Sequence, residues 1–143
     1  MKVPDEIYDQ FLWRRDCQIQ AQELLSTLLI LGTFGEMIAS NLLTCFTDNM
    51  SILHALTKGS ASKDAPDLNQ LVGRTWLHVA KKQIGFHLLR VESKANPTDG
   101  PTRGDCSMMD KLGAEWMEPR LPTWSVDVWR PLKWEKWDDM TWM

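Results

Sequence analysis

Three carboxylates in this sequence lie in surroundings that could make them functional. Glu23 lies inside a long apolar stretch, Asp48 directly follows a short apolar run, and Asp99 lies in a polar segment after a second such run. Carboxylates that gather in one place repel one another unless a cation neutralises them. Mg²⁺ prefers oxygen ligands, and two such ions about 3.5–4 Å apart can activate a water for phosphodiester cleavage. A fold that brings these side chains together would form a divalent-cation site.

Residues 42–47 (LLTCFT) predict the element that positions Asp48. The run is short, apolar and flanked by turn-forming residues, which is typical of a buried central strand in an α/β sheet. A helical pattern begins at Met50, so Asp48 would lie at the carboxyl end of the strand, where ligands bind in open α/β folds. The alternative is that Asp48 only caps the following helix.

A helix over residues 13–39 would position Glu23. Its apolar residues lie nearly all round, which predicts a largely buried helix in which Gly32 and Gly35 loosen or end the last turns. At about 100° per residue, Glu23 lies within the arc of Ile19, Ile30, Phe34 and Met37. A carboxylate on a buried arc is costly unless a metal, a cation or a proton compensates. The alternative is that Glu23 faces solvent near the start of the helix.

The second half of the chain would position Asp99. A polar loop over residues 60–66 leads to a second helix over 67–83 with Asp67 as its cap, and residues 85–91 predict a second strand. Residues 91–105, rich in Pro, Gly and charge, follow that strand and contain Asp99. Right-handed connections between parallel strands would put both strand ends at one edge of the sheet. Asp48 and the segment carrying Asp99 are therefore expected at the same edge.

The histidines and basic residues of this half are expected to be ordinary. The helix over 67–83 has one apolar stripe, and Arg74, His78 and Lys81 fall largely outside it, which predicts a solvated basic face with a surface histidine. His87 is expected to be an ordinary strand side chain, since no partner lies at metal-ligand spacing. The apolar stripe of this helix comprises Leu68, Leu71, Val72, Thr75, Trp76 and Val79.

The totals favour a small intracellular protein, in the cytoplasm or nucleus. The length of 143 residues fits one domain or one domain with a tail. Of these residues 43% are hydrophobic, and the net charge is −3. Cys17, Cys45 and Cys106 form no CxxC pair and are expected to be reduced thiols. No apolar run is long enough to span a membrane.

Three regions are expected. Residues 1–12 form a lead with no clear element, residues 13–105 form the α/β domain, and residues 106–143 form an irregular tail. The tail holds six of the eight tryptophans. It is expected to be weakly ordered or to lay its tryptophans on a partner surface.

Two motifs carry a resemblance to a known family. Residues 47–59 (TDNMSILHALTKG) and 90–105 (RVESKANPTDGPTRGD) resemble the ribonuclease H-like domain of retroelement reverse transcriptases, of DIRS-like or gypsy-like type. Residues 19–25 (IQAQELL) are similar to the helix that supplies an acidic residue in that family. The resemblance covers residues 13–105 and implies a partial ribonuclease H-like α/β fold, with a long buried helix, two parallel core strands and packing helices.

The resemblance also implies an activity and a site. The family uses four carboxylates to hold two Mg²⁺ (or Mn²⁺) and hydrolyses the RNA strand of RNA–DNA hybrids. Glu23, Asp48 and Asp99 would be the second, third and fourth of these catalytic metal ligands. The substrate-binding residues implied by the motifs are Asn49, Lys94, Asn96 and Arg103.

The sequence departs from the family at its amino end. The family's first Asp lies on the first of three antiparallel strands before the long helix, and only a dozen residues precede that helix here. Asp5 and Asp9 lie too close to the helix to replace it. The chain is therefore expected to be a truncated relic or one piece of a polyprotein, with little or no nuclease activity alone. An uncovered strand edge would favour self-association.

Two other function classes remain open. One is a non-catalytic nucleic-acid or protein binding module on the same fold, in which Arg74, Lys81 and Lys82 hold phosphate and the tail tryptophans stack bases or dock a partner. The other is an unrelated α/β domain whose acidic residues are caps and surface charges. Metal dependence separates an enzyme from a binding platform.

Overall fold

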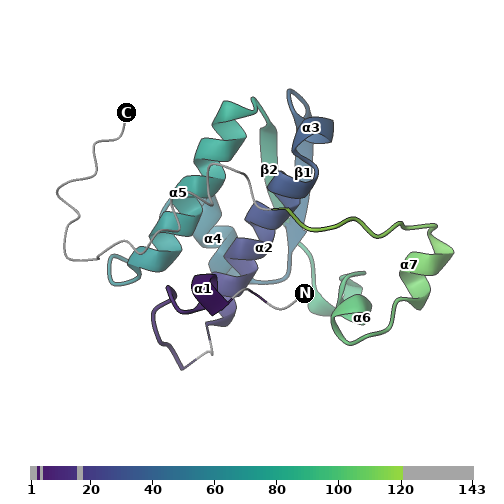
Figure 1. Cartoon of the computed structure of the whole chain (residues 1–143), viewed down its shortest axis with the longest axis horizontal. Helices are drawn as coiled ribbons and strands as arrows, with labels where there is room; N and C mark the ends of the chain where they lie inside the picture. The colour runs from purple at the N-terminus through teal and green to yellow at the C-terminus, as the bar shows by residue number, and fades with distance from the viewer. Residues whose placement is uncertain (1–2, 4, 16–17, 121–143) are drawn as a thin grey trace.

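The computed structural model describes residue 3, residues 5–15 and residues 18–120. Cys17 and five of the six tail tryptophans, at positions 124, 129, 134, 137 and 142, lie outside these residues. The expected α/β class is confirmed, with helices packed against a small parallel sheet (Figure 1). The elements in chain order are α1 (Asp5–Tyr8), α2 (Ile19–Thr33), α3 (Gly35–Ile38), β1 (Leu42–Thr47), α4 (Met50–Lys58), α5 (Pro66–Lys81), β2 (Gly85–Arg90), the 3₁₀ turn η1 (Ser93–Ala95), α6 (Asp99–Thr102) and α7 (Ser107–Lys111).

The two strands pair in parallel, as the sequence predicted. The register runs from Leu42 opposite Gly85 to Thr47 opposite Arg90, and the chain passes from β1 to β2 through α4 and α5. Thr47 and Arg90 therefore end the two strands side by side. The segments that leave them, one carrying Asp48 and the other leading to Asp99, start from the same edge of the sheet.

The core lies between α2, α4 and α5. Leu24, Leu25 and Leu28 of α2 are at most 1% exposed and pack with Leu56 of α4 and Leu71 of α5. The predicted apolar stripe of α5 is confirmed, with Trp76 half-buried and the rest buried. A second cluster joins this layer to the inner face of the sheet and consists of Leu31, Val79 and Ile84, packed with Ile38, Leu43, Trp76 and Phe86.

The expectation that residues 42–47 form a buried strand is wrong for one face. Leu42 is 91% exposed and Phe46 63% exposed, while Leu43 and Cys45 between them are half-buried. Successive side chains of a strand point to opposite faces. The helices cover only the inner face, and no described element covers the outer one, where Leu89 of β2 is also exposed.

The expected helix over 13–39 is shorter and divided. Gln18, with φ 59°, precedes the first helical residue, and the helix ends at Thr33 before the separate turn of α3 begins at Gly35. Arg14 lies outside the helix because its guanidinium pairs with the Asp67 carboxylate at the start of α5. This ion pair joins residues 53 positions apart, so the local periodicity could not reveal it.

Asp67 is not the cap of α5, as had been expected. Ala65 is the N-cap, and Asp67 lies in the first turn, where its carboxylate accepts hydrogen bonds from Arg14 and from the backbone N–H of Leu12 at 3.0 Å. These bonds fix the preceding segment, whose Ile7 and Phe11 are buried in the core. The lead therefore has an element, α1, and a packing role.

The predicted basic outer face of α5 is also wrong for Arg74 and His78, which are only 4% and 3% exposed. Helix α2 packs along α5, and His78 hydrogen-bonds the backbone of Leu31. Burial lowers the pKa of Arg74 to about 10 and lowers that of His78 below its usual value. Lys81 is exposed, and Lys82 pairs with Glu36 at 2.7 Å.

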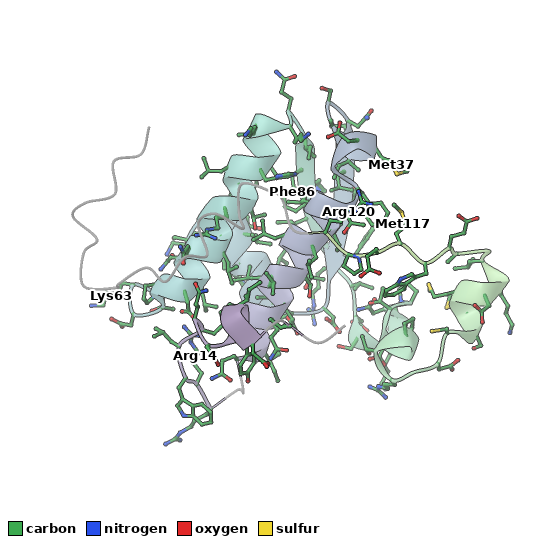
Figure 2. All side chains as sticks on the ribbon, viewed as in Figure 1. Arg14, Met37, Lys63, Phe86, Met117 and Arg120 are labelled. Atoms are coloured by element: carbon green, nitrogen blue, oxygen red, sulfur yellow. The ribbon has the colours of Figure 1, made fainter. Side chains whose placement is uncertain are left out.

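The segment after β2 leaves the helical layer and then returns. Helices α6 and α7 lie at the right of Figure 1, away from α5. The chain then runs back to α2, where the backbone N–H of Arg120 donates to the Thr33 hydroxyl at 2.9 Å (Figure 2). Trp116 on this returning segment is 78% exposed. No helix within the described ranges is long and apolar enough to cross a membrane.

Candidate acidic site

The three carboxylates singled out in the sequence line one hollow of about 370 Å³. Glu23 comes from α2, Asp48 from the turn between β1 and α4, and Asp99 from the start of α6. Asn96 lines the same hollow. Its other lining residues are Ser26, Thr27, Ile30, Phe46, Thr47, Ile52, Thr98 and Thr102.

Glu23 is half-buried beside the turn that follows β1. Its Oε2 accepts a hydrogen bond from Nδ2 of Asn49 at 2.5 Å. Burial raises the pKa of Glu23, the Asn49 bond lowers it in part, and the charge of Asp48 raises it again. The arc that Glu23 shares with Ile19 and Met37 is not the buried one, since both of these side chains are exposed. Glu23 therefore lies at the border between core and hollow.

Asp48 does not cap α4. The N-cap is Asn49, whose Oδ1 accepts hydrogen bonds from the backbone N–H groups of Ser51 at 2.9 Å and Ile52 at 3.3 Å. The alternative that Asp48 is only a helix cap is therefore excluded by the geometry of this turn. Asp48 is half-buried in the wall of the hollow instead.

The segment after β2 supplies another part of the lining. Oδ1 of Asn96 accepts hydrogen bonds from the backbone N–H of Thr98 at 3.1 Å and from its hydroxyl at 2.8 Å, which closes a tight turn just before α6. Asp99 begins α6 and pairs with Arg103 one turn later at 3.1 Å. The side chain of Arg103 is 77% exposed.

The predicted site residues divide into two groups. Glu23, Asp48, Asn96 and Asp99 line the hollow, and Asn49 contacts it through Glu23. Arg103 contacts it only through its ion pair with Asp99. Lys94, on η1, is exposed and is not among the lining residues.

The oxygen atoms that line this hollow are of the chemical types that bind hard divalent cations. Carboxylate, amide and hydroxyl oxygens are the donors that Mg²⁺ and Mn²⁺ accept. Within the described part of the chain, however, no three His, Cys, Asp or Glu side chains lie close enough together to hold one ion. Asp99 is engaged with Arg103, and Glu23 and Asp48 repel each other while both are charged. The three carboxylates therefore line the same hollow but do not form a single coordination site.

Sequence reasoning missed the hydroxyl groups of the hollow. Ser26 and Thr27 lie one helical turn after Glu23, and Thr102 lies one turn after Asp99. Residues three and four apart share one face of a helix. That spacing was the signal that could have identified Ser26, Thr27 and Thr102 as neighbours of the carboxylates.

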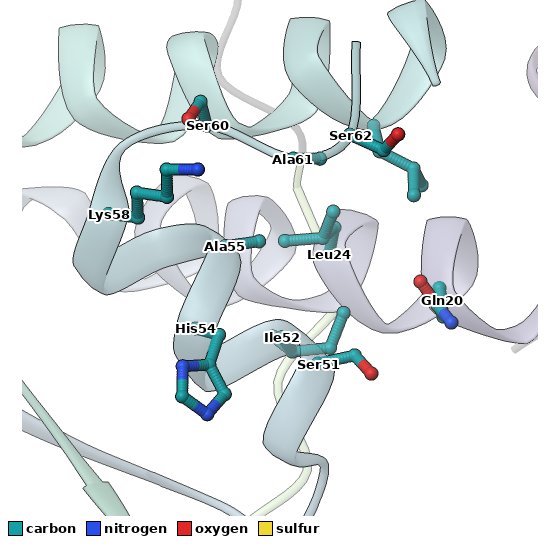
Figure 3. Close-up of a pocket in the computed structure, with 11 residues that line it drawn as sticks. Gln20, Leu24, Ser51, Ile52, His54, Ala55, Lys58, Ser60, Ala61 and Ser62 are labelled. Carbon is teal, nitrogen blue, oxygen red and sulfur yellow. The ribbon is translucent and has the colours of Figure 1, made fainter. Parts of the chain in front are cut away.

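A second hollow, of about 310 Å³, lies between α2, α4 and the loop after α4 (Figure 3). Its apolar floor includes Leu24 and Ala55, and Lys58 and Ser60 lie together at one side of it. None of its lining residues is acidic, in contrast to the first hollow. The other lining residues are Gln20, Ser51, Ile52, His54, Ala61, Ser62 and Leu68.

No protein-family profile, no curated protein and no solved structure matches this chain.

Proposed function

We propose that this chain is a ribonuclease H-like module whose acidic hollow binds divalent cations and the scissile strand of an RNA–DNA hybrid. One observation carries the proposal: Glu23, Asp48 and Asp99 come from three separate segments and line one hollow at the carboxyl ends of two parallel strands. The order of elements agrees with it, since a helix, a strand, two helices, a strand and an acidic segment follow one another.

The residues of the hollow have distinct parts in this proposal. A pair of bound divalent cations would supply an activated water and would stabilise the leaving oxygen. Glu23 from α2, Asp48 from the turn after β1 and Asp99 from the start of α6 would hold them. Arg103, which pairs with Asp99, would then be released to face substrate phosphate.

The proposed activity of the 143 residues by themselves is weak. Three carboxylates carry less charge and fix fewer coordination positions than the family's four, and Asp99 must first leave Arg103. Among the described residues, no strand covers the second edge of β1, so the turn carrying Asp48 has support from β2 alone. We expect cation binding to be retained more readily than cleavage.

The test is Mn²⁺ titration of the full chain, followed by cleavage of a labelled RNA–DNA hybrid. Asp48→Asn and Asp99→Asn are compared with Asp110→Asn, which changes an exposed aspartate outside the hollow. We expect the first two variants to weaken Mn²⁺ binding about tenfold or more and the third to leave it unchanged. Binding with cleavage that Asp48→Asn abolishes would support the enzyme. Absence of Mn²⁺ binding in the unmodified chain would refute the proposal.

A non-catalytic nucleic-acid binding module is the second candidate, and the hollow without acidic residues favours it. Lys58, with the hydroxyls of Ser60 and Ser62 nearby, offers donors for phosphate, whereas Arg74, expected earlier to do so, is buried. In this case the hybrid binds equally well in EDTA, and Lys58→Gln weakens binding while Lys63→Gln, an exposed control, does not. Equal binding by both variants would exclude this hollow as the binding surface.

A further inference from the structure

Strand β1 has one free edge within the described part of the chain. The sheet consists of two strands, and β2 pairs with β1 along one edge only. On that edge the carbonyl of Asn41 accepts from the backbone N–H of Gly85 at 2.9 Å. The carbonyl of Thr47 accepts from the backbone N–H of Val91 at 3.0 Å. Because the backbone groups of successive strand residues point to opposite edges, the odd-numbered residues from 41 to 47 point theirs towards β2.

The even-numbered residues of β1 point their backbone groups to the free edge. These residues are Leu42, Thr44 and Phe46, and they are exposed on the outer face of the sheet. No described residue hydrogen-bonds the backbone of any of the three. A row of unpaired N–H and C=O groups is a template on which another extended segment can add as a strand.

The described part of the chain ends close to the start of this edge. The backbone N–H of Arg120 donates to the hydroxyl of Thr33 at the end of α2. Leu31, in the same turn of α2, packs in one cluster with Leu43 near the start of β1. Figure 1 shows the segment that leads to Arg120 reaching α2 from the side of β1 that faces away from β2. Residues 121–143, which lie outside the described residues, therefore continue from a point near the first residues of β1.

The sequence that follows Arg120 contains a run with the pattern of a strand. Over residues 123–128 (TWSVDV) the apolar residues Trp124, Val126 and Val128 alternate with polar ones. Alternation with a period of two, in valine and tryptophan, is typical of a strand. The run has six residues, as β1 has. Only two residues separate it from Arg120, so the run can begin beside the start of β1.

We propose that residues 123–128 add to the free edge of β1 as a third strand, supplied by the same chain. The new strand enters beside the start of β1 and therefore runs parallel to it. Its apolar side chains lie on the outer face, because Leu42 and Phe46 offer them apolar neighbours on the adjacent strand. The outer face itself stays open, and the strand that leads to Asp48 gains a second pairing partner. This arrangement needs neither a cation nor a nucleic acid, so it stands or falls independently of the proposed function.

The proposal fixes which residues of the new strand donate to β1. Of two neighbours on one face of a parallel pair, one turns its backbone groups towards the partner strand and the other turns them away. Thr44 turns its backbone groups to the free edge, so Val126 beside it turns its own away. Ser125, whose side chain lies on the other face, therefore donates its N–H to β1.

The test is amide hydrogen exchange of the full chain, followed residue by residue by NMR. We expect the N–H groups of Leu42, Thr44 and Phe46 to be protected from exchange, as those of residues 43 and 45, which face β2, should be. Exchange of the three edge N–H groups at the rate of exposed amides would overturn the proposal.

Two proline variants separate pairing by residues 123–128 from other causes of protection. Ser125→Pro removes a donor to β1 and breaks the middle of the run, so we expect exchange of the three edge N–H groups to rise about tenfold or more. Thr141→Pro lies in the same tail but outside the run and should leave their exchange within about twofold of the unmodified chain. Residues 43 and 45 should stay protected in both variants, which shows that the pairing of β1 with β2 is intact. Equal exchange of the edge N–H groups in the two variants would overturn the proposal.

A second copy of the chain is the alternative occupant of this edge. An edge-to-edge dimer would protect the same N–H groups, but their protection would fall as the protein is diluted. Protection that does not change with concentration, in a protein that sediments as a monomer, supports a strand from the same chain. Protection that is lost on dilution overturns it in favour of self-association.

Discussion

The ion pair between Arg14 and Asp67 should contribute more to stability than any other pair whose geometry is given above. The Asp67 side chain is 2% exposed and the Arg14 side chain 21%. The carboxylate accepts two hydrogen bonds from the guanidinium and one from the Leu12 N–H. A hydrogen bond to a charged group contributes about 1.5–3 kcal/mol. Because Arg14 can regain water when its partner is lost, we expect Asp67→Ala to cost less than the combined range of the three bonds (about 4.5–9 kcal/mol), namely about 3 kcal/mol.

The assay is urea unfolding followed by circular dichroism, with a double-mutant cycle. Asp67→Asn, which keeps an acceptor for Leu12, should cost about 2 kcal/mol, and Arg14→Met with Asp67→Asn should show a coupling energy above about 1 kcal/mol. Glu36→Gln breaks the exposed pair with Lys82 and should leave the urea midpoint almost unchanged, because solvent screens this pair. If Asp67→Asn costs no more than Glu36→Gln, the pair does not fix the segment before α2, and the reason given for the late start of that helix is wrong.

Three further predictions follow from burial and charge. Burial and the charge of Asp48 raise the pKa of Glu23 and so disfavour its charged form, and Glu23→Gln should therefore raise the melting temperature without divalent cations. The same variant should abolish any rise in melting temperature caused by Mn²⁺. A variant that still gains stability from Mn²⁺ would exclude Glu23 as a ligand. Burial lowers the pKa of His78, so the unfolded chain binds a proton near pH 6.5 that the folded chain does not, and the free energy of unfolding should fall as the pH is lowered through about 6.5. His78→Gln should reduce this pH dependence, measured by urea unfolding at pH 7 and 5.5. An unchanged pH dependence would contradict the burial of His78. Leu42→Thr on the outer sheet face should change the free energy of unfolding by less than about 0.5 kcal/mol, whereas Leu28→Ala should cost about 3 kcal/mol, and similar costs would mean that the outer face is covered.

The elements around the site were largely predictable from local pattern. The apolar runs at 42–47 and 85–91 and the stripe of the helix over 67–83 gave the two strands and α5 to within a residue or two, because their periods match their structures. Parallel pairing then placed Asp48 and the Asp99 segment at one edge. This agreement concerns the arrangement of the chain, and the assignment to the ribonuclease H-like family stays a prediction.

The failures have a common cause in contacts that are distant in sequence. Arg14 is drawn out of the expected helix by Asp67, and His78 is buried on a flank of α5 that its own helical pattern marks as polar, where it hydrogen-bonds the backbone of Leu31 on α2. Leu42 is exposed because the described helices pack on the inner face of the sheet alone. None of these partners lies within one or two helical turns of the residue concerned, so periodicity carries no trace of them.

The turn after β1 resolves the ambiguity that the sequence left at Asp48. Capping needs a side-chain acceptor at the residue just before the first helical one, and Asn49 occupies that place. Asp48 lies one residue earlier, so its carboxylate does not cap the helix and lines the hollow instead. If Asp48 were the cap, its charge would be satisfied by backbone N–H groups and would have little affinity left for a cation. The Asp48 carboxylate is therefore available to a ligand in the hollow, which is why Asp48→Asn should weaken Mn²⁺ binding while the Asn49 cap of α4 stays in place.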